Sequence, residues 1–301
     1  MEKLYIVIDV GGSSIKYGLM TEKGEVLEKG SIKTVKEDAN KLIDSIGNIV
    51  DKYKLENNIL GLACSFPGAV NPKTGIIGGG SSIPCIHGPN IKDLLQNRTG
   101  LKVSIENDAN CAALAEGWLG AAKNNKNYIC LVIGTGIGGC IIINNSILRG
   151  ANLHGGEFGY MLLEDSQDPI GKIWSKKSST FALVTEVSKR LSIPIDNLNG
   201  KKIFEMAEEG NIDIIKIIDK WYKGIARGIF NLQYIIDPEK ILIGGAISER
   251  EDFIDNINVK LKEMKNDIAT LDIKVEKCRF SNDSNLIGAL YNFLCQYEVI
   301  K

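Results

Sequence analysis

The sequence has no long apolar run, no paired-cysteine motif and almost no histidine. No stretch of its 301 residues approaches the roughly 18 consecutive apolar residues of a membrane span, so we expect no membrane partner. Its seven cysteines lie scattered in apolar runs without a C-x-x-C spacing, which favours reduced core thiols. The two histidines, His87 and His154, lack Cys or acidic partners at ligand spacing, so we assign neither to a metal.

A net charge is almost absent as well. The chain has 36 basic and 37 acidic side chains, and it has no long basic run, so we expect no nucleic-acid partner. Two dense charge runs, residues 172–177 and 260–265, are interpreted as solvated surfaces. The N-terminal residues enter an apolar strand with no small-residue cleavage site, which favours a cytoplasmic location.

The pattern that is present is one of strands and helices that repeats. Residues 4–9, 15–20 and 26–34 predict three antiparallel strands, which precede a helix at 38–53 and strands at 59–66 and 103–107. After an Ala-rich helix at 109–119, a strand, a glycine turn and a strand recur over residues 128–150. This internal repeat predicts an α/β protein of two duplicated lobes.

The remaining sequence fills the second lobe and returns to the first. Helices are predicted over residues 178–191, 201–209 and 211–235, strands over 240–245 and 273–280, and a last helix over 285–298. We expect the first lobe to span residues 1–117 and 285–301, and the second to span residues 118–284. No low-complexity linker separates them.

The first glycine turn has the features of a polyphosphate site. Asp9 places a carboxylate at the end of a strand, and Gly11, Gly12 and Ser13 then offer backbone amides and a hydroxyl free of bulky side chains, with Lys16 nearby. This combination suits a polyphosphate and its Mg²⁺ ion. The turn is neither a P-loop nor a Rossmann turn, because a strand follows it where a helix would open. Taken alone, it is better explained as an ordinary hairpin turn.

Two further glycine clusters follow strands in the second half. Gly134, Thr135 and Gly136 have the same strand–turn–strand setting, and two such turns facing each other across a cleft would clamp one nucleotide triphosphate. Gly244 and Gly245 end an apolar strand, where small residues would let an adenine or a ribose approach the backbone. A helix start is the alternative interpretation of this third cluster.

Acidic and amide residues cluster at the predicted junction of a strand and a helix. Helix capping by Asn107 or Asp108 explains part of the set. The functional interpretation makes Asp108 a general base that takes the proton from an attacking sugar hydroxyl, with Asn107 hydrogen-bonded to that sugar. Glu157 lies in a glycine-lined loop and could accept hydrogen bonds from vicinal hydroxyls, or it is simply an exposed loop residue.

Together these segments resemble the ROK family of repressors and sugar kinases, in the actin-like superfamily. The likeness covers nearly the whole chain and rests on five segments in family order: residues 8–20, 61–75, 106–120, 133–160 and 241–248. It implies two actin-like, ribonuclease H-like lobes with a cleft between them, and a homodimer.

The resemblance also implies roles for individual residues. ATP contacts are implied at Gly11, Gly12, Lys16, Thr135, Gly136 and Gly245. Asp108 is implied as the catalytic base, and Asn107 and Glu157 as sugar contacts. The implied reaction transfers the γ-phosphoryl group of ATP to a hexose hydroxyl, usually on C6, with Mg²⁺.

The sequence departs from the family in its zinc segment. Kinases of this family typically carry GExGH and then CxCGxxGCxE, but here Tyr160 replaces the His and residues 161–180 contain no cysteine. We therefore expect no structural zinc, as in the zinc-free branch similar to β-glucoside kinases and N-acetylmannosamine kinases. Ser175 falls near the position of the missing Glu.

A second departure concerns residues 81–88, where glucose kinases often present a Pro-Asn pair to the sugar. Ser82 and His87 are the candidates to line the pocket instead, and Gly68 and Tyr160 complete the predicted sugar-binding set. Both departures loosen the inference to glucose itself, so the candidates include glucose and a substituted sugar, such as a 2-acetamido sugar or a β-glucoside.

Two alternatives to an enzyme stay open. ROK repressors share this core, but no helix-turn-helix region is visible before Leu4, and Asp108 is retained. A sugar-binding protein that has lost catalysis is the other alternative, because the zinc segment is altered.

Overall fold

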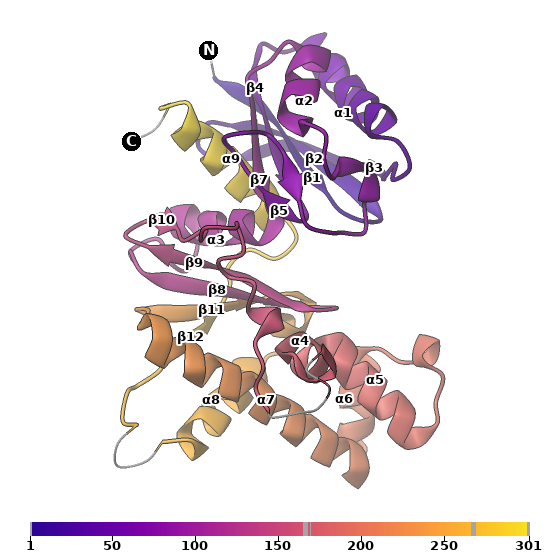
Figure 1. Cartoon of the computed structure of the whole chain (residues 1–301), viewed down its shortest axis with the longest axis vertical. Coiled ribbons are helices and arrows are strands. Elements are labelled where there is room, and N and C mark those ends of the chain that lie inside the picture. The colour runs from indigo at the N-terminus through magenta and orange to yellow at the C-terminus, as the bar shows by residue number, and fades with distance from the viewer. Residues whose placement is uncertain (1, 165–167, 169, 266–268, 300–301) are drawn as a thin grey trace. The chain divides into compact units, whose positions relative to one another are not determined.

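The computed structural model describes residues 2–164, 168, 170–265 and 269–299, and its chain forms two compact units (Figure 1). Unit 1 consists of Met1–Lys123, Arg149–His154 and Asn282–Lys301, and unit 2 consists of Asn124–Leu148 and Gly155–Ser281. Compared with the division predicted from the sequence, residues 118–123, 149–154 and 282–284 group with unit 1. Each unit is an α/β layer structure with its own sheet and core.

The sheet of unit 1 has the strand order β3-β2-β1-β4-β7. Its strands are β1 (Leu4–Val10), β2 (Ser14–Thr21), β3 (Val26–Lys33), β4 (Ile59–Phe66) and β7 (Val103–Asn107). The first three strands form an antiparallel meander, while β4 pairs parallel with β1 and β7 pairs parallel with β4. The five strands predicted for this lobe are confirmed.

Helices pack on the two faces of this sheet. Strand side chains alternate between faces, so Ile6, Ile8 and Val10 of β1 enter the core that α1 (Ala39–Lys54) and α2 (Ile91–Thr99) cover. Tyr5 points the other way and meets Phe293 of α9 (Ser284–Gln296), with ring centroids 5.4 Å apart. The C-terminal helix α9 and α3 (Asp108–Leu119) therefore belong to the second face of the sheet.

The sheet of unit 2 has the order β10-β9-β8-β11-β12. Its strands are β8 (Tyr128–Ile133), β9 (Ile137–Ile143), β10 (Ser146–Ile147), β11 (Lys240–Gly244) and β12 (Val275–Lys277). Again an antiparallel meander is followed by two parallel strands, so the two sheets share one topology. The predicted internal repeat is thereby confirmed.

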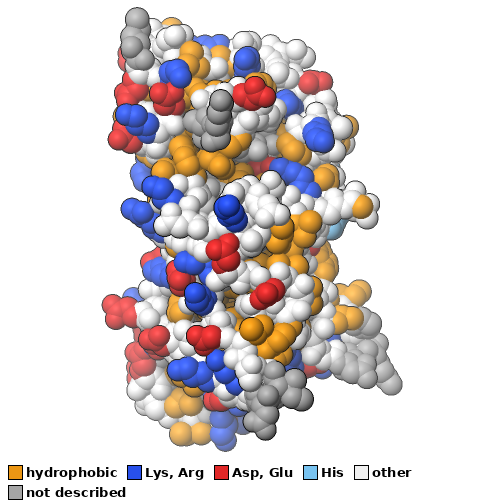
Figure 2. All heavy atoms as spheres, turned by 90° about the vertical axis from the view of Figure 1, so that its left-hand side faces the viewer, with side chains coloured by type: hydrophobic (Ala, Val, Ile, Leu, Met, Phe, Trp, Pro, Cys, Tyr) orange, Lys and Arg blue, Asp and Glu red, His pale blue; other side chains and the backbone are white. Residues whose placement is uncertain are grey.

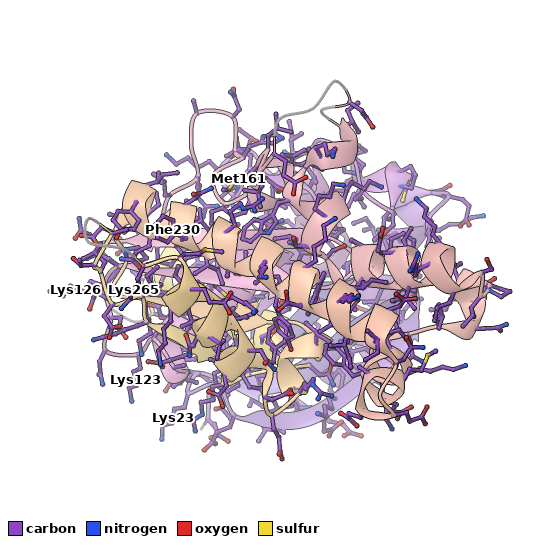
Figure 3. All side chains as sticks on the ribbon, turned by 90° about the horizontal axis from the view of Figure 1, so that it is seen from below. Lys23, Lys123, Lys126, Met161, Phe230 and Lys265 are labelled. Carbon is purple, nitrogen blue, oxygen red and sulfur yellow. The ribbon has the colours of Figure 1, made fainter. Side chains whose placement is uncertain are left out.

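The helices of unit 2 build one core on its sheet. They are α4 (Trp174–Ser178), α5 (Thr180–Leu191), α6 (Gly200–Glu208), α7 (Ile212–Ile236) and α8 (Phe253–Glu263). Trp174, at 0% exposure, lies in the middle of this core, and no side chain fits at Gly228 of α7 because the Trp174 ring occupies the space. Met161 and Phe230, both labelled in Figure 3, are partly buried against the same core.

Short elements complete the described chain. They are β5 (Ala69–Val70), β6 (Ile77–Gly78) and the 3₁₀ turns at Pro84–Ile86, Phe158–Tyr160, Ile170–Lys172, Ile195–Asn197 and Ala246–Glu249.

Several predictions on secondary structure were incomplete. The helices α2 and α8 were not predicted, and the strand predicted at 273–280 is only Val275–Lys277. The predicted helix 178–191 breaks at Ser179, which ends α4 and also caps α5 by accepting a hydrogen bond from the Ala182 amide. The charge run 260–265 is not simply solvated, because the side chain of Lys260 is 14% exposed and pairs with Asp219.

The surface charge of the described chain is mixed, as its near-zero net charge predicts. Figure 2 shows acidic and basic side chains interspersed over one face of the molecule. Among the described residues, no helix combines the length and the apolar character needed to cross a membrane.

The close packing of α9 against α3 yields a testable prediction. A Cβ atom at Gly288 would overlap the backbone of Cys111. We expect Gly288→Ala to lower the free energy of unfolding by about 1–3 kcal/mol through overpacking, although alanine is the better helix former. Urea unfolding of both proteins measures the change.

The matched control for this variant is Gly80→Ala. A Cβ atom at Gly80 meets nothing within 4 Å, and the backbone there has no positive φ. We expect a change within about 0.5 kcal/mol. Equal effects of the two substitutions would contradict the packing argument.

Candidate functional site

Polar residues of unit 1 gather where its parallel strands end. Asp9 is the residue before the last of β1, and its Oδ1 accepts hydrogen bonds from Ser65 Oγ at 2.9 Å and from Asn285 Nδ2 at 3.0 Å. Because β1 and β2 pair Asp9 directly with Lys16, the carboxylate and the ammonium group share one face of the sheet. Ligands of open α/β sheets bind at the carboxyl ends of the strands, so this edge is the candidate site of unit 1.

The first glycine turn is fixed in place by Thr34. The buried Thr34 hydroxyl donates to Gly11 O at 2.6 Å, and the Thr34 amide donates to Ser13 O at 3.3 Å. Gly12 packs closely against Ser82, because a Cβ atom at Gly12 would overlap the Ser82 Oγ and would require that side chain to move. Within the described ranges, the amides of Gly12 and Ser13 have no hydrogen-bond acceptor. A rigid turn with open amides suits an anion such as phosphate.

Asp108 opens α3 at the end of the neighbouring strand β7. Its Oδ1 accepts hydrogen bonds from Asn107 Nδ2 at 3.0 Å and from the Ala109 amide at 2.8 Å. Asn107 is the N-cap of α3, since its Oδ1 accepts from the Asn110 amide at 3.1 Å, and its Nδ2 also donates to Gly68 O at 3.0 Å. Asn107 therefore both caps α3 and positions the Asp108 carboxylate.

A fully buried carboxylate, Glu106, supports this junction. Arg149 pairs with it through both terminal nitrogens, with 3.0 Å between Nη1 and Oε1. The Asn107 amide, at 2.8 Å, and Asn110 Nδ2, at 2.9 Å, also donate to Oε1. A buried carboxylate needs such compensation, because desolvating an unpaired charge is costly.

The thiol of Cys111 shows how closely these carboxylates converge. Burial raises the pKa of the Cys111 thiol well above its ordinary value. The negative charges of Glu106, Asp9 and Asp108 raise the pKa further. Three acidic residues from β1, β7 and α3 therefore lie close enough for their charges to act on one thiol of α3.

Gly68 and the loop of residues 81–88 lie beside Asn107. Gly68 has a φ of 99°, which favours glycine, and a Cβ atom there would lie 3.1 Å from His87 Cε1. His87 Nε2 shares a hydrogen bond of 2.8 Å with Ser81 Oγ. The structure thus brings together, in unit 1, the predicted residues Asp9, Gly11, Gly12, Ser13, Lys16, Gly68, Ser82, Asn107 and Asp108.

In unit 2 the second and third glycine clusters also meet at a sheet edge. Gly134 follows β8 and Gly244 ends β11, and these two strands pair parallel with Val132 opposite Gly244. Gly245 has a φ of 98°, and a Cβ atom there would overlap the backbone of Ile133. The cluster Gly134–Gly136 and the pair Gly244–Gly245 are therefore neighbours, although more than 100 residues separate them (Figure 1).

Two residues from α4 and α5 hold the second glycine turn. The Thr180 amide donates to Gly134 O at 2.9 Å. Ser175 Oγ accepts from the Ile137 amide at 2.8 Å and donates to Ile137 O at 3.3 Å. Ser175, which the alignment places near the missing family Glu, therefore braces the turn. In the part of the chain that the structure describes, the amides of Thr135 and Gly136 have no hydrogen-bond acceptor.

The predicted sugar contacts Glu157 and Tyr160 lie in unit 2, in a loop whose Gly159 packs against Ile137 O and Ser175 Oγ, beside the second glycine turn. Glu157 is exposed and precedes the 3₁₀ turn Phe158–Tyr160, and Tyr160 is 70% exposed. This loop is anchored at Gly156, where φ is 92° and a Cβ atom would overlap the backbone of Gly139. No hydrogen bond of the Glu157 side chain to another described residue is present.

The Asp9 carboxylate is a suitable ligand for Mg²⁺. Mg²⁺ is usually held by one or two carboxylates together with substrate phosphates, and Asp9 offers a carboxylate beside the open amides of Gly12 and Ser13. Across the described residues, no group of three or more His, Cys, Asp or Glu could hold a metal ion by itself. The absence of structural zinc stays a prediction.

Several supporting residues were missed from the sequence. Thr34, Ser65, Thr180 and Asn285 each hold a predicted site residue, and Arg149 holds Glu106, which directly precedes Asn107. Thr34, Ser65, Arg149 and Asn285 each lie between 23 and 276 positions from the residue that they hold. The only local signal is a polar residue next to the end of a strand or helix.

The chain as a whole matches a known protein family and curated proteins. The model of the ROK family matches residues 5–295. A "beta-glucoside kinase" of Listeria innocua is 36% identical over 289 residues, which cover 95% of this chain and 96% of that protein.

Solved structures that resemble this chain over nearly its whole length include a ROK family protein and a putative sugar kinase. A ROK family protein from Streptococcus pneumoniae, in complex with sucrose, superposes with a TM-score of 0.90 and 36% identity, over 99% of this chain and 100% of that chain. A putative N-acetylmannosamine kinase from Listeria monocytogenes superposes with a TM-score of 0.91 and 33% identity, over 98% and 99% of the two chains.

The Glu106–Arg149 pair yields the prediction of this subsection. Arg149→Met leaves the buried Glu106 carboxylate without its cation, so we expect a loss of about 3–5 kcal/mol in the free energy of unfolding. Urea or thermal unfolding measures this loss. The double variant Glu106→Gln with Arg149→Met removes both charges, and we expect it to recover most of the stability. If the double variant is no more stable than Arg149→Met, the pair does not stabilise the junction as argued.

Proposed function

This chain belongs to the ROK family, and we propose that it is an ATP-dependent kinase that phosphorylates a hexose or hexose derivative on its C6 hydroxyl. The observation that carries the proposal is the convergence of Asp108, Asp9 and the first glycine turn at one sheet edge. The actin-like α/β fold and the kinases among the relatives support the same class of reaction.

In this proposal Asp108 is the catalytic base. Its carboxylate takes the proton of the sugar hydroxyl while the hydroxyl oxygen attacks the γ-phosphorus of ATP. The bond from that phosphorus to the β,γ-bridging oxygen breaks, and ADP leaves with the electron pair. The hydrogen bonds from Asn107 and Ala109 orient the carboxylate before the sugar arrives, so little reorganisation is needed at the moment of transfer.

We assign the nucleotide contacts to the glycine turns of both units. These contacts are Asp9, Gly11, Gly12, Ser13 and Lys16 in unit 1, and Gly134, Thr135, Gly136, Gly244 and Gly245 in unit 2. The unpaired amides in the first and second turns support the assignment to phosphate groups. When bound, Mg²⁺ neutralises charge on the phosphates, and Asp9 is the residue that would hold it.

The proposed sugar is a β-glucoside or a 2-acetamido sugar. The proposed contacts are Asn107, Gly68 and Ser82 in unit 1, with Glu157 and Tyr160 in unit 2. The names of two relatives, beta-glucoside kinase and putative N-acetylmannosamine kinase, support this choice, as does Tyr160 in place of the usual His. The homodimer and the cytoplasmic location stay predictions.

The first prediction concerns Asp108. We expect Asp108→Asn to lower kcat by about 10²–10⁴-fold, because the amide cannot accept the proton. ADP release is measured with glucose, mannose, fructose, N-acetylmannosamine, N-acetylglucosamine and cellobiose. The sugar that gives turnover in the parent protein names the substrate.

Asp93→Asn is the matched control for Asp108→Asn. Asp93 also lies in the first turn of a helix and also accepts a hydrogen bond from the capping Asn, from Asn90 Nδ2 at 2.7 Å. We expect its kcat to stay within about twofold of the parent value. Sugar binding without turnover in the parent protein would favour a non-catalytic sensor or regulator of the same family.

The second prediction concerns the turn brace at Ser175. Ser175→Ala removes both hydrogen bonds to Ile137, so the second glycine turn loses part of its support. We expect the KM for ATP to rise by about 5–10-fold while the KM for sugar changes little, as one or two lost hydrogen bonds would produce. Ser146→Ala, in the short strand β10, is the control. An unchanged KM for ATP would remove the turn from the nucleotide site.

A further inference from the structure

A pocket of about 500 Å³ opens in unit 2 between α4, α5 and α7. It contains none of the residues proposed for ATP or sugar. Its volume falls within the range of about 300–1,000 Å³ that small-molecule sites occupy. The long helix α7, which runs across the side of unit 2 seen in Figure 3, supplies half of its lining.

The lining is strongly cationic. It includes seven Lys or Arg side chains and only three acidic ones, although the whole chain is nearly neutral. Three of the cations are neutralised within the protein: Arg190 pairs with Asp213, Lys223 with Asp219 and Arg227 with Glu164. The other four, Lys176, Lys177, Lys216 and Lys220, form no salt bridge with any described residue. Among the described lining acids, Glu186 forms no salt bridge, and Asp213 interacts with the charge of Lys216 as well as pairing with Arg190.

The inner part of the pocket is apolar and carries one unsatisfied hydroxyl. Leu183, Ile217 and the buried Trp221 contribute apolar surface. Ser178, which also lines the pocket, has 0% exposure, and its Oγ lacks a hydrogen-bond partner among the described residues. A buried hydroxyl without a partner costs free energy, so it marks a place where a ligand group would be stabilised.

We propose that this pocket binds a small organic phosphate. The anionic phosphate meets the four unpaired lysines, while an uncharged organic body covers the apolar part. Lysine is a strongly hydrated point charge that suits phosphate well. An inorganic anion would leave the apolar part of the lining, to which the half-buried Ile217 contributes, uncovered, so the organic body distinguishes the proposed ligand from free phosphate.

The inference does not rest on the kinase proposal, because no lining residue belongs to the catalytic or nucleotide set. The charge run at residues 172–177, interpreted from the sequence as a solvated surface, supplies two of the four unpaired lysines. In this proposal Lys176 and Lys177 of that run bind the phosphate group of the ligand.

The test is calorimetric titration of the full chain with glucose 6-phosphate, AMP, inorganic phosphate and glucose. The variant Lys216→Glu with Lys220→Glu reverses two of the unpaired charges. We expect glucose 6-phosphate or AMP to bind the parent protein more tightly than inorganic phosphate does. We expect the variant to bind the same organic phosphate at least about tenfold more weakly. The organic probe that binds more tightly indicates whether the ligand is a sugar phosphate or a nucleotide.

The matched control is Lys189→Glu with Lys201→Glu, which makes the same change of charge on exposed helical lysines outside the pocket. We expect it to bind the probe like the parent protein, and all three proteins to share one KM for ATP. A probe that still binds the pocket variant with parent affinity overturns the proposal, and so does equal weakening in the control. The proposal is also overturned if no organic phosphate binds the parent protein, or if none loses its binding in the pocket variant. Thermal unfolding verifies that each variant is folded.

Discussion

The structure around Asp108 depends on one buried charge. Glu106 is fully inaccessible to solvent, and such a carboxylate is tolerated only when donors surround it. Arg149 supplies two of those donors, and the Asn107 amide and the Asn110 side chain supply the others. This constraint fixes the last residue of β7 and the first turn of α3 together, and so it sets where Asp108 can lie.

Parallel strands then turn this fixed point into a site. The ends of β1, β4 and β7 lie side by side, so Asp9, Ser65 and the Asn107–Asp108 pair become neighbours, although they are far apart in the sequence. Unit 2 repeats the geometry with β8 and β11, whose ends carry the other two glycine clusters. A shared topology thus places two sets of small residues at equivalent edges of two sheets.

The fold was largely predictable because hydrophobic periodicity marks long elements well. The strands of unit 1 and the helices α1, α6, α7 and α9 carry that signal, whereas α3 lacks it and was predicted from its alanines and from the capping residues Asn107 and Asp108. The helix α2 was missed despite readable ends, Asn90 as N-cap and Gly100 as the left-handed C-cap, because only nine residues lie between them. The helix α8 was missed because its charged C-terminal half conceals the apolar positions Phe253, Ile257 and Leu261.

The site was predictable in part for a different reason. Residues that would touch a ligand, such as Gly12 and Asp108, stand in local patterns that a sequence shows. Residues that hold them, such as Thr34 and Arg149, act through contacts that no local pattern encodes. Ser175 is the clearest case, since its neighbours in the sequence give no hint that it hydrogen-bonds the start of β9.

The partner of Asp9 has a consequence for the order in which the molecule is made. Asn285 follows Asp9 by 276 positions, so β1 leaves the ribosome long before its partner does. Unit 2 is complete in sequence by Ser281, before α9 has been synthesised. Synthesis of unit 1 therefore begins before that of unit 2 and ends after it, and the α9 face of its sheet stays uncovered while unit 2 is being made.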